Sequence, residues 1–288
     1  MLESHLDHLP RSFAILTSSL NTLRLDSGLR LRVADALVPP PNMKTRLKDI
    51  LYAIVFVDDK VVTIARPKKH TVHPADMHVL VATIGSPAVK GSAASWLPIC
   101  LPRFNANGLL HTYASYLELP INTAPSTSQA AEAGEAHREH EEDSTNDAHA
   151  PAVCLVIVSA SGDFEIVRQW ADVATSRLRD GETLRQLLKA AQRSTYSVDE
   201  LGIPGLRHFF FKSRPNVQVT SPVFEGVEAP VQGDGRAKIE LEDEWERLFN
   251  LYRVVWDAIH AKSGQECTLK LQYVRTETVS VMGWVSGI

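Results

Sequence analysis

The chain has 288 residues, about twice the length of a typical domain, so we expect two domains. Hydrophobic residues make up 44% and charged residues 22%, as in a globular protein with well-formed cores. The formal net charge of −4 excludes a globally basic nucleic-acid binder. The longest apolar runs, residues 50–57 and 152–158, fall far short of the roughly 20 residues that a membrane-spanning helix needs. Residues 1–11 carry acids and histidines and do not predict a signal peptide.

The cysteines Cys100, Cys154 and Cys267 lie in apolar, strand-like runs without paired spacing. We therefore expect buried, reduced thiols of a cytosolic protein rather than disulfides.

The first forty residues contain three short helical patterns, residues 2–9, 13–20 and 29–37, which proline and glycine interrupt. They are typical of a segment that follows an upstream module. Residues 1–43 are accordingly predicted to be a helical connector.

A first regular pattern follows. Two apolar runs, residues 52–57 and 61–65, predict a hairpin. A helix is predicted to begin after His73, with Pro74 at its first position and Asp76 folding back as the acid of a capping box. Three further strands and two helices are expected next, over residues 96–101, 109–117, 153–158, 163–178 and 181–188.

Residues 120–150 interrupt this pattern. They contain seven acids against one arginine and almost no large apolar residue, so they predict a disordered acidic insert. A metal site within the insert is a second interpretation, less favoured than a solvated charge run. Its ligands would be His137, His140, Glu141, Glu142 and His149.

The same order of elements begins again near residue 206. Strands are predicted over residues 206–212 and 217–223, then a long helix, then strands over residues 269–276 and 280–286. The order of elements in the first unit is strand, strand, helix, three strands and helix. This order predicts an α/β sandwich, in which one mixed sheet has helices on its faces. No counterpart of the fifth strand and of the helix that covers it is predicted in the second unit.

The densest polar stretch is residues 66–78. Arg66, Lys68 and Lys69 precede the N-terminus of the predicted helix, where free N–H groups favour anions, so they form a candidate acidic-lipid patch. A solvated loop is the alternative. A metal site is a third interpretation, disfavoured because the helical histidines are five residues apart. Its ligands would be His70, His73, Asp76 and His78.

The long helix of the second unit carries an aromatic stripe at helical spacing. Such a stripe is a partner surface or, more often, part of a core. Its members are Trp245, Phe249, Tyr252 and Trp256. The sequence carries no nucleotide-binding fingerprint or hydrolase motif, and it predicts no catalytic residue, cofactor or metal.

Three ordered strings carry a family resemblance: RPKKHTVHPADMHVL, WLPICLPRFNANGLLHTYASYLE and YSVDELGIPGLRHFFFKS. Through them the sequence resembles the Mon-one family of vacuolar fusion proteins, whose members carry three longin domains, which are profilin-like α/β sandwiches. The resemblance implies that residues 44–193 are the second longin domain, with the insert 120–150. Residues 194–288 would be the start of the third domain, without its last strand and helix, and residues 1–43 the connector from the first.

The resemblance also implies a function. In this family the protein is a subunit of the Mon–Ccz guanine-nucleotide exchange factor, which activates the late-endosomal and vacuolar Rab GTPase in vacuole fusion, endosome maturation and autophagy. The implied partners are a Ccz-type longin subunit, the Rab GTPase through the complex, and late-endosomal, multivesicular-body or vacuolar membranes, contacted peripherally from the cytoplasm. Two alternatives remain: a sister three-longin protein of the Hermansky–Pudlak or Fuzzy type, and a small-ligand or metal sensor on a longin-like sandwich.

Overall fold

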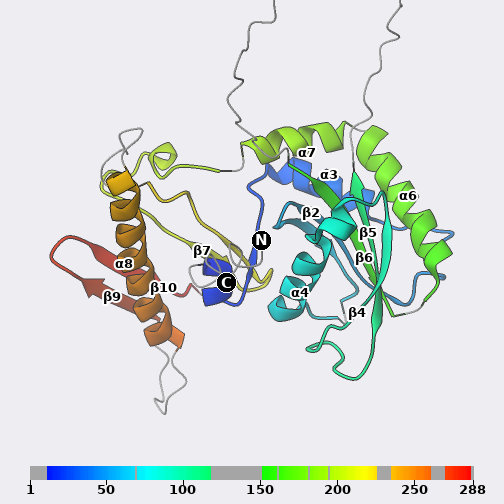
Figure 1. The fold of residues 1–288 in the computed structure, drawn as a ribbon, viewed down its shortest axis with the longest axis horizontal. Helices are drawn as coiled ribbons and strands as arrows, with labels where there is room; N and C mark the ends of the chain where they lie inside the picture. Colours follow the sequence, from blue (N-terminus) through cyan, green and yellow to red (C-terminus); the bar gives the residue numbers. More distant parts are fainter. Residues whose placement is uncertain are drawn as a thin grey trace, which may run out of the picture.

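The computed structural model describes residues 12–68, 70–117, 151–160, 162–180, 182–193, 195–225, 235–260 and 270–286, with side chains from residue 240 onward in the helix that begins at Gly235. Two α/β units lie side by side, and the segment from residue 12 to residue 26 runs between them (Figure 1).

The first unit is built on one five-stranded antiparallel sheet with the order β3-β2-β6-β5-β4. Its strands are β2 (Ile50–Val57), β3 (Lys60–Ala65), β4 (Ser95–Ile99), β5 (Leu110–Leu117) and β6 (Val153–Ser159). Every residue of β2 and β6 is buried, because these continuous apolar runs lie in the sheet interior with helices on both faces.

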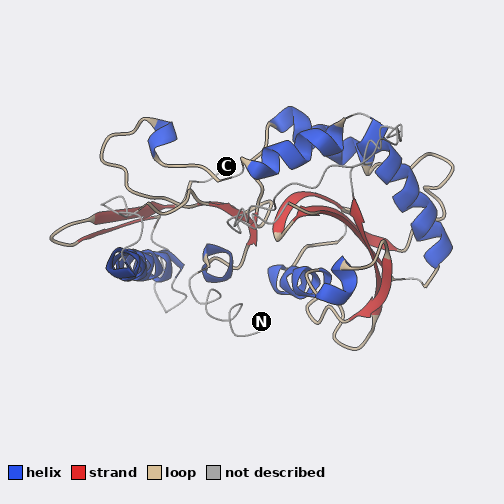
Figure 2. Ribbon diagram, turned by 45° about the horizontal axis from the view of Figure 1, so that its top comes forward, coloured by secondary structure: helices blue, strands red, loops and turns tan. Residues whose placement is uncertain are grey.

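Helices cover both faces of this sheet (Figure 2). On one face lie α4 (Pro74–Ile84) and α5 (Pro87–Lys90), and on the other α3 (Ser27–Ala36), α6 (Phe164–Asp180) and α7 (Thr183–Gln192). Met77 and Leu80 of α4 pack on one face, and Trp170 and Leu178 of α6 on the other. The predicted α/β sandwich is confirmed, but the prediction of a mixed sheet is wrong, because all neighbouring strands of this sheet are antiparallel.

The second unit has two smaller sheets, β1-β8-β7 and β10-β9. Its elements are η2 (Asp199–Leu201), β7 (Phe211–Ser213), β8 (Gln218–Thr220), α8 (Gly235–His260), β9 (Leu271–Arg275) and β10 (Ser280–Trp284). One helix packs against both sheets, since residues of α8 share a core with Val219 of β8 and with Val281 of β10.

The predicted strands over residues 206–212 and 217–223 are too long, because the paired residues are only Phe211–Ser213 and Gln218–Thr220. Within the described part of the chain β7 has a neighbouring strand on one edge alone, so no second ladder extends it.

The N-terminal segment joins the units, through α2 (Phe13–Leu16) and β1 (Leu20–Asn21). β1 pairs in parallel with β8, while Thr22 forms a parallel bridge to Val61 of β3. The amide of Leu23 donates to the carbonyl of Val61 at 3.0 Å. The segment therefore lies between the edge strands of the two units and closes one edge of each.

The predictions for the cysteines and for the acidic insert have different outcomes. Cys154 is buried, as predicted, but Cys100 is exposed, because it follows the last residue of the edge strand β4. Cys267 and the acidic insert lie outside the described residues. The positions next to the insert are neighbours, since Leu117 pairs with Val153.

Candidate functional site

The loop of residues 66–73, before α4, is held by hydrogen bonds from side chains to its backbone carbonyls. The hydroxyl of Tyr52 on β2 donates to the carbonyl of Thr71 at 2.8 Å, and the Arg66 guanidinium donates to the carbonyl of His70. The imidazole of His70 lies edge-on to the ring of Phe104, with 5.6 Å between centroids. Burial raises the pKa of Tyr52, so its phenol stays protonated and remains a donor. This loop is thus fixed in place.

The two predicted helix caps behave differently. His73 caps α4 as expected, since its Nδ1 accepts from the amide of Ala75 at 3.2 Å. The capping-box role of Asp76 is wrong. Its carboxylate is buried and accepts from the amides of Arg103 and Phe104 at 3.0 and 2.8 Å, so it anchors the β4–β5 loop instead.

Two residues of the candidate acidic-lipid patch are described, and both Arg66 and Lys68 are exposed, while Lys69 lies outside the described residues. The bonds of Asp76 bring the loop of Arg103, a further exposed cation, against the N-terminus of α4. Sequence reasoning missed Arg103, because no spacing reveals which distant backbone a buried carboxylate will bind.

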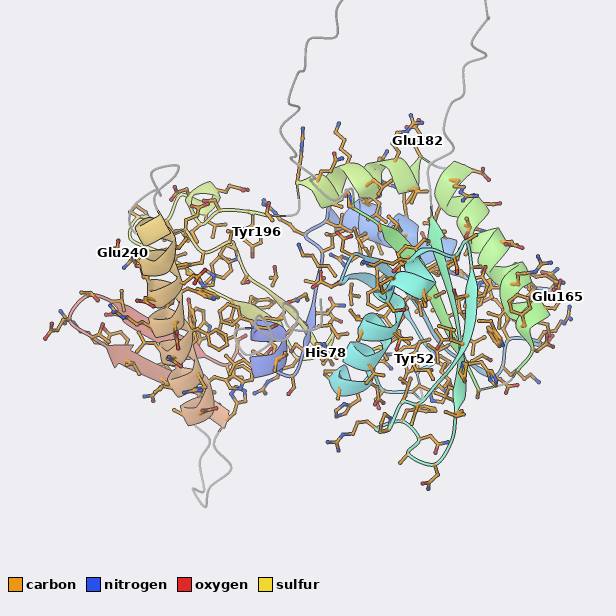
Figure 3. The ribbon with its side chains drawn as sticks, viewed as in Figure 1. Tyr52, His78, Glu165, Glu182, Tyr196 and Glu240 are labelled. Carbon is orange, nitrogen blue, oxygen red and sulfur yellow. The ribbon has the colours of Figure 1, made fainter. Side chains whose placement is uncertain are left out.

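The residues of the metal interpretation do not converge. Among the described residues there is no group of three or more histidine, cysteine, aspartate or glutamate side chains that could hold a metal ion. His78 is half-buried beside the N-terminal segment (Figure 3). Burial lowers the pKa of His78, opposed by the backbone of Ser19. The insert histidines and acids lie outside the described residues.

The aromatic stripe of α8 lies in the core of the second unit. Phe249 and Tyr252 are buried, and Trp245 and Trp256 are half-buried. At the centre is Phe13 of α2, whose ring centroid lies 4.7 Å from that of Phe210, 5.5 Å from that of Trp245 and 5.4 Å from that of Tyr252. Such offset and edge-on pairs add to the free energy gained by burial. The N-terminal segment thus supplies a central residue of this core.

A buried histidine, missed in the sequence, lies among these rings. His208 Nδ1 is 3.1 Å from the hydroxyl of Tyr252, and Nε2 is 3.3 Å from the carbonyl of Pro222. Burial lowers the pKa of His208 to about 4 and raises that of Tyr252 to well above its usual range. Both groups are therefore neutral at physiological pH and act as a hydrogen-bonded core pair. Its only signal was a histidine directly before the three phenylalanines of residues 209–211.

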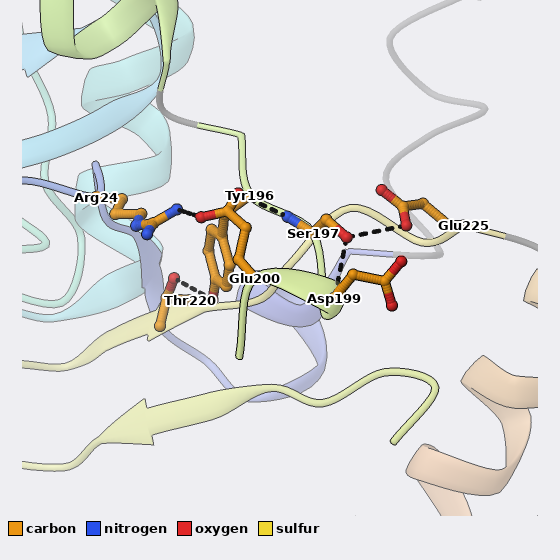
Figure 4. A network of polar contacts seen from close by, with 7 residues as sticks. All are labelled: Arg24, Tyr196, Ser197, Asp199, Glu200, Thr220 and Glu225. Carbon is orange, nitrogen blue, oxygen red and sulfur yellow. Dashed lines mark hydrogen bonds and ion pairs between the residues drawn. The ribbon is translucent and has the colours of Figure 1, made fainter. Parts of the chain in front are cut away.

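A polar network joins the N-terminal segment to the second unit (Figure 4). Arg24 is ion-paired with Glu200 at 2.8 Å, and its guanidinium lies 4.8 Å from the centroid of the Tyr196 ring. The Ser197 hydroxyl donates to Glu225 at 3.0 Å. The bond from Arg24 lowers the pKa of Glu200, which keeps the carboxylate charged.

Two family models match the chain in succession. The model described as the second longin domain of FUZ, MON1 and HPS1 matches residues 48–172. The model described as the third longin domain of the same three proteins matches residues 205–287. Each match falls within one of the two units of the fold.

Relatives match nearly the whole chain. A protein named vacuolar fusion protein MON1 from Cryptococcus neoformans var. neoformans serotype D is 36% identical over 275 residues, which is 95% of this chain and 37% of the relative. MON1 homolog A from Gallus gallus is 28% identical over 98% of this chain and 43% of its own length. The Homo sapiens homolog A is 29% identical over 96% and 35%. The chain therefore spans less than half the length of these relatives.

Proposed function

The chain belongs to the MON1 family of longin-domain proteins, and from this premise we propose that it is a scaffold part of a guanine-nucleotide exchange factor subunit in vacuole fusion. The complex is of the Mon–Ccz type and activates the late-endosomal and vacuolar Rab GTPase, serving endosome maturation and autophagy. The observation that carries the proposal is the succession of second and third longin domains over the two units.

The domain assignment belongs to this proposal. Residues 44–193 are the second longin domain, and residues 194–288 are the start of a third. In the first domain β6 fills the place between β2 and β5, and α6 covers one face. Among the described residues of the second unit nothing corresponds to β6 or α6. Residues 1–43 are the connector from a first domain.

The proposed action needs no covalent or acid–base step. An exchange factor binds the nucleotide-free GTPase more tightly than the loaded one and so shifts its population. In this proposal the chain binds its Ccz-type partner and the membrane. The GTPase is contacted through the complex. The aromatic stripe of α8 supports a scaffold, because its buried and half-buried rings hold one unit together.

Membrane contact is proposed to be peripheral, on late endosomes, multivesicular bodies and vacuoles. None of the described helices is both long and apolar enough to span a bilayer. The exposed cations Arg66 and Lys68, with Lys69 beside them in sequence, are the proposed contact with acidic lipids.

Competition tests this function. A full-length MON1 relative with its Ccz-type partner is expected to release labelled nucleotide from the Rab GTPase, and this chain alone is expected to release none. A roughly ten-fold excess of the chain should slow release by drawing away the partner subunit, as mass action requires. An unrelated longin protein at the same concentration is the control. An unchanged rate would contradict the proposal, as would release by the chain alone.

A further inference from the structure

A cavity of about 420 Å³ opens on the second unit, between the N-terminal segment and α8. Four stretches that are distant in sequence line it: the start of α2, the end of β1, the chain after β8 and the first half of α8. The ring contacts of Phe13 place α2 against α8 (Figure 1). A cavity of this volume is within the range of ligand-binding pockets.

Three aromatic rings form the apolar walls of the cavity. The ring centroids of Phe224 and Trp245 lie 5.0 Å apart with 37° between the ring planes, and Phe13 meets Trp245 edge-on. Phe13 is buried, whereas Phe224 and Trp245 are half-buried, so part of each of these two rings faces the cavity. The faces of aromatic rings carry a negative potential that attracts cations, most strongly for tryptophan.

The polar groups of the cavity include several hydrogen-bond acceptors. The carboxylate of Glu242 lines it and is exposed, and within the described part of the chain this carboxylate forms no ion pair. The side chain of Asn21 and the hydroxyl of Ser12, which does not cap α2, offer two further oxygens. None of the described lining residues is a lysine, arginine or histidine. The cavity therefore favours a positively charged group.

The charges around the cavity also favour a cation. Glu240 and Asp243, next to the lining carboxylate on α8, are exposed. The charge of Arg207 is compensated by its ion pair with Glu244. His208, whose ring packs against two of the aromatic walls, is neutral at physiological pH, because burial lowers its pKa to about 4. Neither of these two basic residues therefore opposes a bound cation.

Flat aromatic walls beside a single carboxylate fit a guanidinium better than an ammonium group. A guanidinium is planar, stacks on aromatic rings and donates two parallel hydrogen bonds to one carboxylate. The ammonium of lysine is a compact and strongly hydrated point charge. The aliphatic stem of an arginine can pack on the apolar walls while its charged end reaches the carboxylate.

We propose that this cavity binds an arginine side chain from a basic segment of a partner protein, with the guanidinium stacked on Trp245 and Phe224 and donating to Glu242. The inference rests on the proposed scaffold function, and it adds the chemistry of a partner segment and the residues that receive it. Because Phe13 and Asn21 belong to the N-terminal segment, the bound arginine also stabilises the packing of this segment on the second unit.

Fluorine NMR of the full chain labelled with 5-fluorotryptophan tests the proposal, since Trp245 is one of five tryptophans. The probe is the peptide acetyl-Gly-Ser-Arg-Ser-Gly-amide. The Trp245 resonance is expected to shift and to saturate at about 10 mM peptide or below, while that of Trp170 in the first unit stays in place. The same peptide with citrulline has the shape of arginine without its charge and should cause no saturable shift. No saturable shift with the arginine peptide, or an equal shift with the citrulline peptide, would overturn the proposal.

A matched pair of substitutions on α8 locates the site. Glu242→Gln removes the carboxylate charge of the cavity and should weaken binding of the arginine peptide at least about ten-fold. Asp257→Asn removes the same charge at an exposed position farther along the helix, outside the cavity, and should change binding less than about two-fold. Equal binding by the two variants would overturn the proposal.

Two further titrations cover other cations. A peptide with lysine in place of arginine should bind more weakly, and equal binding would overturn the assignment to a guanidinium. Tetramethylammonium stands for the cation of a choline headgroup. If it saturates the Trp245 shift at a lower concentration than the arginine peptide, the cavity belongs to a lipid and the proposal is wrong. None of these readouts involves nucleotide release or a Ccz-type subunit, so this inference and the proposed function can fail separately.

Discussion

The ring of Phe13 packs edge-on against the ring of Tyr252, with 5.4 Å between their centroids. Phe13 belongs to the N-terminal segment and Tyr252 to the long helix α8, so a residue far upstream completes the core of the second unit. The same segment gives Val33, Ala36 and Leu37 to the core of the first unit. Both units therefore depend on it.

Phe13→Ala is expected to lower the free energy of unfolding of the second unit by about 3–5 kcal/mol, because it removes a ring from a packed aromatic cluster. Urea denaturation followed by tryptophan fluorescence measures this, since Trp245 lies 5.5 Å from Phe13. Ile15→Ala, at a position 43% exposed on the same helix, should cost no more than about 0.5 kcal/mol. Equal losses of unfolding free energy in the two variants would contradict the prediction, because they would show that the ring of Phe13 does not stabilise this core.

The stability of the second unit should fall in mild acid through His208. Its pKa is about 4 in the folded chain, below the usual 6.5, so between these values the unfolded chain binds a proton that the folded chain does not. The full contribution is present above pH 6.5 and is lost as the pH falls toward 4. The loss between pH 7 and pH 5 is about 2 kcal/mol.

Denaturation of the wild-type chain and of His208→Gln at both pH values measures this contribution. Glutamine keeps a hydrogen-bonding group without a titrating charge, so the variant should show a pH dependence smaller by about that amount. Identical pH dependences would refute the role of His208.

Replacing residues 121–149 with a short Gly/Ser linker should change the free energy of unfolding by about 1 kcal/mol or less. Loop closure costs rise slowly with length, and Leu117 and Val153 on either side are already paired. The same linker in place of residues 102–108 is the control, and it should cost more, because it removes the ring of Phe104 from the core and alters the loop whose amides bind Asp76. A large drop in melting temperature on removal of the insert would contradict the prediction.

Lys68→Ala/Lys69→Ala should weaken binding to phosphatidylserine liposomes by roughly 30-fold at low ionic strength, from about 1 kcal/mol per lysine near an anionic surface. The fold should persist, since Lys68 is exposed. Lys90→Ala/Lys189→Ala, exposed cations on α5 and α7, serves as the charge-matched control. Sedimentation that is equally reduced in both variants would assign the effect to net charge rather than to this loop.

Sequence periodicity was sufficient for the first unit. The all-apolar runs of β2 and β6 and the stripes of α4 and α6 are local patterns that the packing of one sheet between helices preserves. The N-terminal segment was harder to predict. Phe13 and Val33 look alike in a short helical pattern, yet they enter different cores, which depends on contacts distant in sequence.

The same limit applies to the candidate sites. The cap at His73 is local and was predicted, whereas the partners of Asp76 lie in another loop and were not. The helical spacing of the aromatic stripe on α8 did not decide between a core and a partner surface, because spacing does not show what covers these side chains. The exposed cross-strand pair of Tyr273 and Met282 depends on strand register, which a single sequence does not determine.

The most direct test of the scaffold account is light scattering coupled to size-exclusion chromatography on the chain co-expressed with a Ccz-type subunit. The account predicts one peak at the mass of a one-to-one complex, with both subunits retained at physiological salt. A chain that elutes alone while the Ccz-type subunit elutes separately would contradict it.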